Sequence, residues 1–288
     1  MDHVDLDDGR RMDIRVTGPE SGRVLLFHPG TPAAAARLRA LERPAYERGL
    51  RVVSVSRPGY AGSTRRRGRS VVDVVSDVDQ VLRQLGADST LVLGWSGGGA
   101  HALACAARLP QASAVAVIAS GAPQPAEGLD WFAGMHPGNV EGFTAAIEGE
   151  PSVRPLLEKE LPDMLAGSAA ELASVMADGA AEVDRAYLSG ELVEDFLAGN
   201  RAALEAGVDG WCDDALALVN DWGFEVGEIA VPTMVWHGGA DVFAPVAHGE
   251  WLVGRIPGVR AHLFPDEGHF SVGVGRMGEI LDELISFG

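Results

Sequence analysis

The chain has 288 residues, of which 47% are hydrophobic and 22% charged, an ordinary composition for a globular protein. This length is sufficient for one large α/β core, with or without an inserted segment. The formal net charge of −18 argues against nucleic acid and anionic membranes as partners. We also expect no membrane partner, because no apolar run approaches the length needed to cross a bilayer.

The two cysteines, Cys105 and Cys212, have no metal-ligand spacing and do not form a disulfide framework. Residues 1–8 are acidic and lack the apolar segment of a signal peptide. We therefore expect a cytoplasmic protein that uses no metal and no cofactor. The sequence does not distinguish a monomer from a homodimer.

The first 122 residues alternate between strand and helix patterns. Short apolar or β-branched runs predict strands at residues 12–16, 24–27, 52–56, 90–93 and 114–119. Residues 33–47 permit a helix, and a capping-box pattern at 70–73 precedes helical spacing up to residue 85. Strands that are apolar throughout and alternate with helices predict a mostly parallel sheet with helices on both faces.

The pattern changes after residue 122. Residues 123–230 contain no convincing strand, a capping-box pattern at 168–171, and helical spacing at 191–206 and 213–222. Strand patterns return at 231–236 and 260–264, and an amphipathic helix is predicted at 277–287. We predict a core made of residues 1–122 and 231–288, with an all-helical cap inserted at 123–230.

Residues 94–98 have the pattern Gly-Trp-Ser-Gly-Gly between a predicted strand and a predicted helix. A glycine on each side lets the chain turn sharply with the Ser96 hydroxyl at the apex. The helix N-terminus behind it supplies free N–H groups and the positive end of a dipole. The pattern alone also fits a glycine-rich turn with an incidental serine, so its context must support Ser96 as a nucleophile.

A serine nucleophile needs a base and a group that orients the base. His269 follows the last predicted strand, and Asp241 follows the strand at 231–236. Both are therefore expected at the carboxyl edge of the sheet, where open α/β sheets bind ligands. Asp266 and Glu267 are closer to the histidine in sequence, but we expect them to be surface charges.

The chain order Ser96, Asp241, His269 is that of α/β-hydrolases. The sequence resembles a serine-triad α/β-hydrolase with a helical cap over nearly its whole length. The similarity rests on five blocks, at residues 28–32, 57–63, 94–98, 237–241 and 267–269. The resemblance implies that Ser96 is the nucleophile, His269 the base and Asp241 the acid.

An acyl-transfer site also needs donors for a negative oxygen. One is expected to be the N–H of Gly97, the residue after the nucleophile. Pro29 and Pro32 have no N–H, which leaves Gly30 and Thr31 in that loop, and the resemblance points to Thr31. This chain differs from the commoner His-Gly pair of the family because Pro29 separates His28 from Gly30.

Four apolar side chains are candidates for the substrate pocket, with ordinary core packing as the alternative. They are Trp95, Trp131, Phe132 and Met135.

Other polar residues are expected to be structural. The arginine-rich run at 65–69 is expected to be a solvated loop, and 57–63 a structural turn that brings Tyr60 near the site. Structural roles are also expected for three histidines, namely His28, His101 and His237, whereas His248 is left open.

These motifs and the resemblance together predict a serine hydrolase with a small-molecule substrate. We expect that substrate to be a small or medium, largely apolar ester that forms an acyl-enzyme. The same triad would also suit an aminopeptidase, with acids such as Glu127, Asp130 or Glu141, or a hydrolase of carbon–carbon bonds. A ligand-binding or signalling protein with little turnover is a further alternative. Serine at the turn argues against the epoxide hydrolase and haloalkane dehalogenase chemistries, which use a carboxylate nucleophile.

Overall fold

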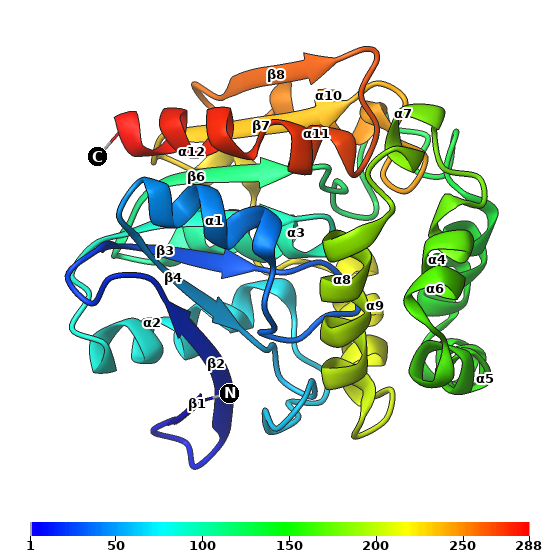
Figure 1. Ribbon diagram of the computed structural model, residues 1–288, viewed down its shortest axis with the longest axis horizontal. Coiled ribbons are helices and arrows are strands. Elements are labelled where there is room, and N and C mark those ends of the chain that lie inside the picture. Colours follow the sequence, from blue (N-terminus) through cyan, green and yellow to red (C-terminus); the bar gives the residue numbers. More distant parts are fainter. Residues whose placement is uncertain (1, 288) are drawn as a thin grey trace.

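The computed structural model describes residues 2–287, apart from the side chain of Ala166, and is built around an eight-stranded sheet (Figure 1). The strand order is β1-β2-β4-β3-β5-β6-β7-β8. The β1–β2 and β2–β4 pairs are antiparallel, and all other neighbours are parallel. The strands are β1 (Asp2–Asp5), β2 (Arg11–Thr17), β3 (Arg23–His28), β4 (Leu50–Val55), β5 (Thr90–Trp95), β6 (Ala112–Ile118), β7 (Thr233–Gly238) and β8 (Arg260–Phe264).

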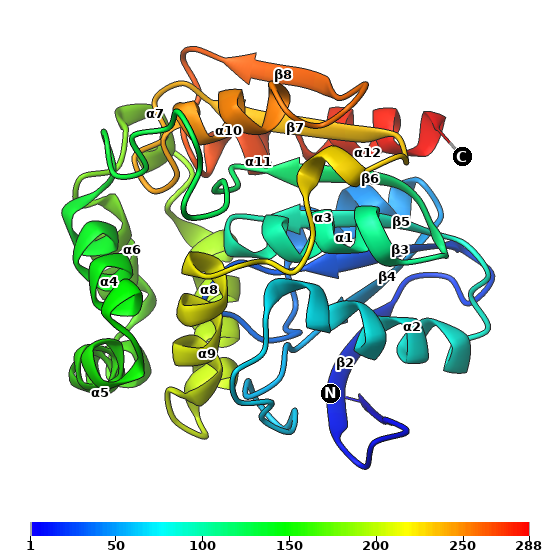
Figure 2. The same cartoon turned by 180° about the vertical axis from the view of Figure 1, so that it is seen from behind.

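Helices cover both faces of the sheet. In Figure 1, α1 (Arg39–Glu47) and α12 (Met277–Ser286) lie in front. The view from behind shows α2 (Val74–Gln84), α3 (Gly97–Arg108) and α10 (Val246–Val253) on the other face (Figure 2). The short segments η1 (Val71–Asp73) and α11 (Ser271–Gly275) precede α2 and α12.

The central strands are buried on both faces. Leu25 packs into the core under α1 and α12, whereas its neighbour Leu26 packs into the core under α2 and α3. Leu91 and Val92 of β5 divide in the same way. Because side chains alternate across a strand, a run of apolar residues supplies both cores at once.

A helical insertion connects β6 to β7, and its described residues contain no strand. Its helices are α4 (Pro137–Glu148), α5 (Glu150–Ala166), α6 (Ala169–Ala177), α7 (Glu182–Arg185), α8 (Gly190–Leu204), α9 (Asp209–Val219) and η2 (Val226–Glu228). Both views place α4–α9 beyond the carboxyl ends of the parallel strands (Figures 1 and 2). Trp131, Met135 and Cys212 belong to a separate apolar cluster within this insertion.

The predicted fold class is confirmed, and each of the seven strands expected from the sequence is present within a residue or two. The structure adds β1, and it starts the first helix at Arg39 rather than at residue 33. The capping boxes predicted at Ser70 and Ser168 both form. Across residues 2–287, the structure has no helix that is both long and apolar enough to span a membrane.

Candidate active site

Ser96 occupies the turn between β5 and α3 in a conformation that non-glycine residues rarely adopt, with φ 54° and ψ −128°. Its backbone N–H donates to the carbonyl of Ile118 on the neighbouring strand at 2.9 Å, and its own carbonyl accepts from Gly99 at 2.9 Å. These bonds hold the strained turn in place. Strain of this kind concentrates at functional sites, so the conformation itself marks Ser96 as a candidate.

Glycines flank this serine because the backbone has no room for side chains. A Cβ atom on Gly94 would lie 2.5 Å from the carbonyl oxygen of Gly98. A Cβ on Gly98 would collide with the carbonyl oxygens of His28 and Pro29, which belong to the loop after β3. The glycines therefore let helix α3 start close behind the serine and directly against that loop.

His269 and Asp241 come together at the carboxyl edge of the sheet. Nδ1 of His269 donates a hydrogen bond to Oδ2 of Asp241 at 2.8 Å. The other oxygen of Asp241 accepts the N–H groups of Phe243 and Ala244 at 2.8 and 2.9 Å. This arrangement fixes the tautomer of the imidazole, because a carboxylate can only accept and Nε2 is then the unprotonated nitrogen.

The environment of His269 favours its protonated form. Burial lowers the pKa of His269, but the negative charge of Asp241, the hydrogen bond to it and the charge of Asp184 outweigh burial and raise the pKa above the usual 6.5. The imidazolium that forms when the ring accepts a proton is therefore stabilised in place.

The loop after β3 is held from behind by a fully buried arginine. The guanidinium of Arg57 donates to the carbonyl oxygens of Pro29 at 2.6 Å and Gly30 at 3.0 Å, and to Oγ1 of Thr31 at 3.0 Å. In a trans peptide the carbonyl and the next N–H point in opposite directions. The N–H groups of Gly30 and Thr31 consequently point away from Arg57.

The counter-ion of Arg57 comes from the helical insertion. Asp214 on α9 is fully buried and accepts from Arg57 at 2.5 Å, from Tyr60 Oη at 3.0 Å and from Thr31 Oγ1 at 2.8 Å. Arg69 is a further partner of this carboxylate. Burial raises the pKa of Asp214, but the two arginines outweigh burial and hold it far below its usual range.

A second carboxylate of the insertion holds the loop that carries His269. Asp184 on α7 is fully buried and accepts the backbone N–H groups of His269 at 2.8 Å, Phe270 at 2.9 Å and Ser271 at 2.8 Å. A Cβ on Gly268 would collide with this carboxylate, so the loop approaches Asp184 closely only because residue 268 is glycine.

Two cavities meet at Ser96 and Thr31. The first, of about 290 Å³, is lined by Trp95, Phe196 and His269 among others. The second, of about 390 Å³, is lined by Gly97 and by a set of apolar side chains. That set includes Trp131, Met135, Phe143, Leu157, Trp211 and Leu218.

The candidate pocket residues divide between these cavities. Trp95 lines the first, and Trp131 and Met135 line the second. The structure places Phe132 outside both cavities, where its ring packs edge-on to Trp131 at a centroid distance of 5.2 Å.

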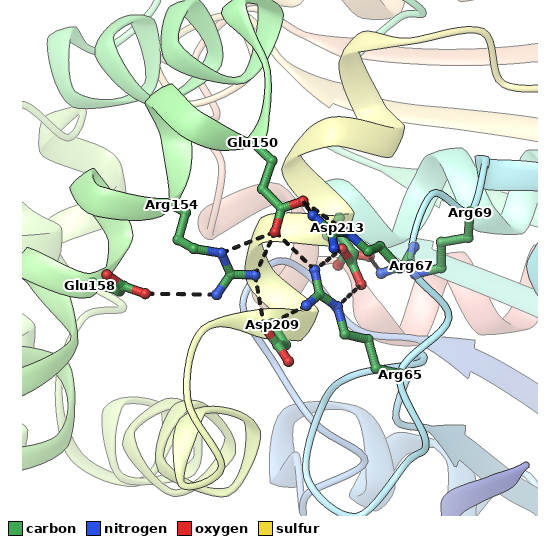
Figure 3. Close-up of polar contacts among 9 residues, drawn as sticks. Arg65, Arg67, Arg69, Glu150, Arg154, Glu158, Asp209 and Asp213 are labelled. Atoms are coloured by element: carbon green, nitrogen blue, oxygen red, sulfur yellow. Dashed lines mark hydrogen bonds and ion pairs between the residues drawn. The ribbon is translucent and has the colours of Figure 1, made fainter.

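The arginine-rich run at 65–69 is not simply a solvated loop, and that prediction was wrong for two of its members. Arg65 pairs with Asp213, Asp209 and Glu150 of the insertion, as Figure 3 shows. Arg69 is buried against Asp214. The run turns inward because acidic residues of α5 and α9 lie opposite it. Arg67 remains largely exposed and pairs with Glu150.

Four buried histidines make structural contacts. Nε2 of His237 donates to the carbonyl of Ala244 at 2.6 Å. His248 accepts the N–H of Ala122 at Nδ1 and donates to the carbonyl of Trp131 from Nε2. His101 contacts the carbonyl of Gly97, and His28 stacks against His101.

Tyr60, which was expected near the site, binds Asp214 behind the loop after β3 and lines neither cavity.

Within residues 2–287, no three His, Cys, Asp or Glu side chains are grouped as a metal site would require.

Sequence reasoning missed Asp184, Asp214 and the buried role of Arg57. An acidic pair, Asp213 and Asp214, within the otherwise apolar helix α9 was the available signal for Asp214, since buried carboxylates are normally paired. Asp184 had no comparable signal in the sequence.

Comparison with known proteins supports the same fold. Residues 23–275 match the family model described as alpha/beta hydrolase fold. The chain is 26% identical to a 2-hydroxy-6-oxononadienedioate/2-hydroxy-6-oxononatrienedioate hydrolase of Cupriavidus pinatubonensis, over 93% of this chain and 87% of the relative. It is 29% identical to a pimeloyl-[acyl-carrier protein] methyl ester esterase of Aromatoleum aromaticum, over 77% of this chain and 81% of the relative. The solved structure of an enol-lactonase from Burkholderia xenovorans superposes with a TM-score of 0.67 at 17% identity, covering 99% of each chain.

Proposed function

Since the chain belongs to the alpha/beta hydrolase fold family, we propose that it is a serine hydrolase that cleaves a small or medium, largely apolar ester through an acyl-enzyme. The observation that carries the proposal is the hydrogen bond from His269 to Asp241, next to a strained serine that shares a cavity with His269. The esterase and hydrolase names of the two curated relatives agree with this reaction class.

The mechanism follows from these groups. Nε2 of His269 takes the proton of Ser96 as its oxygen attacks the ester carbonyl, and Asp241 stabilises the imidazolium. The N–H groups of Gly97 and Thr31 stabilise the negative oxygen of the tetrahedral intermediate, with Gly30 as the other possible donor in the loop. The imidazolium then protonates the leaving alcohol. Water, activated by the same imidazole, releases the acid and restores Ser96.

We assign the two halves of the ester to the two cavities. The leaving alcohol must receive its proton from His269, so we place it in the first cavity, which His269 lines. The acyl group then occupies the second cavity, which Gly97 lines and which is walled by aromatic and aliphatic side chains. That cavity has the volume for a medium-sized apolar acyl group.

A neutral substrate fits better than a dicarboxylate. Arg37 lines the first cavity but lies 3.7 Å from the carboxylate of Asp195. The second cavity contains Glu160, whose pKa is raised above its usual value by burial and by the nearby charge of Glu141. Arg37 is the one Arg or Lys side chain in the described lining of the two cavities, so the second carboxylate of a dianion would find no arginine or lysine there.

The aminopeptidase alternative receives less support. Glu127, Asp130 and Glu141 do not appear in the described lining of either cavity. The acids that do are Asp195, which already accepts from Arg39, and Glu160. We also propose a cytoplasmic location, because Cys105 and Cys212 are both free and buried.

The test is turnover of p-nitrophenyl esters from acetate to decanoate by the wild type and by Ser96→Ala. We expect many turnovers per wild-type molecule and at least a ~10³-fold loss in Ser96→Ala. Release of no more than one equivalent of nitrophenol would contradict the proposal and favour the ligand-binding alternative.

A further inference from the structure

The helical insertion contributes two fully buried carboxylates to the loops that carry the catalytic groups. Asp214 accepts a hydrogen bond from Thr31 in the loop after β3, and Asp184 accepts one from His269 in the loop after β8. We propose that Asp214 and Asp184 are positioning residues. Through them the insertion orients the backbone N–H of Thr31, an oxyanion donor, and fixes the position of His269. The inference rests on the proposed function, and it makes the insertion part of the catalytic apparatus rather than a cover over the substrate.

The Asp214 contact acts through Thr31 and Arg57. Thr31 Oγ1 donates to the carboxylate, and the guanidinium that Asp214 neutralises holds the carbonyl of Gly30. Fixing that carbonyl fixes the N–H of Thr31 on the opposite side of the same peptide. A donor fixed before the reaction begins stabilises an oxyanion far better than one that must be reoriented.

The side chain of Thr31 leaves no room for a side chain at residue 97. A Cβ placed on Gly97 would lie 2.6 Å from Thr31 Oγ1 and 3.1 Å from Thr31 Cβ. The side chain of Thr31 is therefore packed directly against the residue that supplies the other oxyanion donor. Without the bond to Asp214, the Thr31 side chain would be held by this packing and by Arg57 alone.

The Asp184 contact acts on the backbone of the base. Its two oxygens accept three consecutive N–H groups, from His269 to Ser271, and Ser271 Oγ in turn accepts the N–H of Gly268 at 2.7 Å. Asp184, which accepts three of these bonds, lies 85 positions before His269 in the sequence. The loop is thus fixed at four successive backbone positions.

The charged and titratable groups that face His269 are Asp241 from the loop after β7, Asp184 from α7 and His237 from β7. Asp184 therefore affects the imidazole by its charge as well as by position. Neutralising Asp184 should lower the pKa of His269, since one of the two negative charges that raise it is removed.

The experiment compares purified full-length variants after each has been shown to melt cooperatively. Thr31→Val removes the hydroxyl while keeping the Arg57–Asp214 pair, and Thr31→Ser restores the hydroxyl. Asp214→Asn and Asp184→Asn remove the charges. Asp209→Asn is the matched control, since Asp209 lies on the same helix as Asp214 and pairs with Arg65 and Arg154 without contacting either catalytic loop (Figure 3).

We expect kcat to fall about 10- to 100-fold in Thr31→Val, Asp214→Asn and Asp184→Asn with KM nearly unchanged, below the ~10²–10³-fold cost of deleting an oxyanion donor. Asp209→Asn should remain within about threefold of the wild type, and Thr31→Ser should recover most of the kcat that Thr31→Val loses. In Asp184→Asn the acid limb of the kcat/KM profile should move to lower pH, whereas in Thr31→Val it should stay in place.

Three results would overturn the inference: wild-type kcat in folded Thr31→Val and Asp184→Asn, an equal loss in Asp209→Asn, or an unmoved acid limb in Asp184→Asn. If Asp214→Asn does not fold, the comparison of Thr31→Val with Thr31→Ser tests whether the contact with Asp214 orients the N–H of Thr31. Failure of the proposed function is separate, because it appears as absent Ser96-dependent turnover in the wild type itself.

Discussion

Nδ1 of His269 lies 2.8 Å from Oδ2 of Asp241, and the other oxygen of Asp241 is held by two backbone N–H groups. The carboxylate is therefore fixed on both sides and can orient the imidazole before substrate arrives. In Asp241→Asn the amide would favour the wrong tautomer, so kcat should fall about 10³- to 10⁴-fold with little change in KM. Steady-state kinetics on a neutral ester measure this, and a loss of less than tenfold would remove Asp241 from the triad.

The pH dependence of kcat/KM should reflect the hydrogen-bonded pair of His269 and Asp241. His269 acts as a base only when neutral, and its pKa is raised by Asp241 and Asp184 against the opposing effect of burial. kcat/KM should therefore rise with pH along an acid limb centred above about 6.5, the usual imidazole value. A profile measured on an uncharged ester tests this, and a limb centred below the usual value would contradict it.

The wall of the second cavity should set the acyl preference. Trp131→Ala or Met135→Ala enlarges that cavity, so the optimum in an acyl-chain panel should move to longer chains. Phe132→Ala is the matched control, since Phe132 is the next residue and lines neither cavity. If Trp131→Ala and Phe132→Ala shift selectivity equally, the acyl group does not bind there.

The glycine turn should tolerate no side chain at Gly98. A Cβ there would collide with the carbonyls of His28 and Pro29, which are backbone atoms and cannot swing aside. Gly98→Ala should therefore cost about 1–3 kcal/mol of unfolding free energy and displace the oxyanion loop. Gly227→Ala is the control, because its Cβ would meet nothing closer than 3.9 Å. Equal melting temperatures for the two variants would refute the packing argument.

Local patterns were enough to predict much of the sheet and to single out the three candidate catalytic side chains. Leu25 and Leu26 are both buried, on opposite faces, so β3 appears in the sequence as a continuous apolar run. Ser96 stands in a glycine turn that its own neighbours define. β1 was missed because its residues Asp2–Asp5 are mostly polar and exposed, as an edge strand permits.

The supporting network could not be predicted in the same way, because each of its members is explained by a distant partner. Thr31 and Asp214 are 183 positions apart, and Asp184 and His269 are 85 apart. No local periodicity marks a carboxylate that accepts backbone N–H groups from another part of the chain. For the same reason Arg65 and Arg69 resemble a solvated run in the sequence, since their acidic partners on α9 lie 148 and 145 positions away.

The most direct test is to label the protein with a fluorophosphonate, measure its intact mass, and map the modified peptide. If Ser96 is the activated nucleophile, the wild type should gain one phosphonyl group on the peptide that contains Ser96, with concurrent loss of esterase activity. Ser96→Ala should gain none under the same conditions. Equal labelling of both proteins, or a label mapped to another residue, would contradict the assignment of Ser96 as the nucleophile.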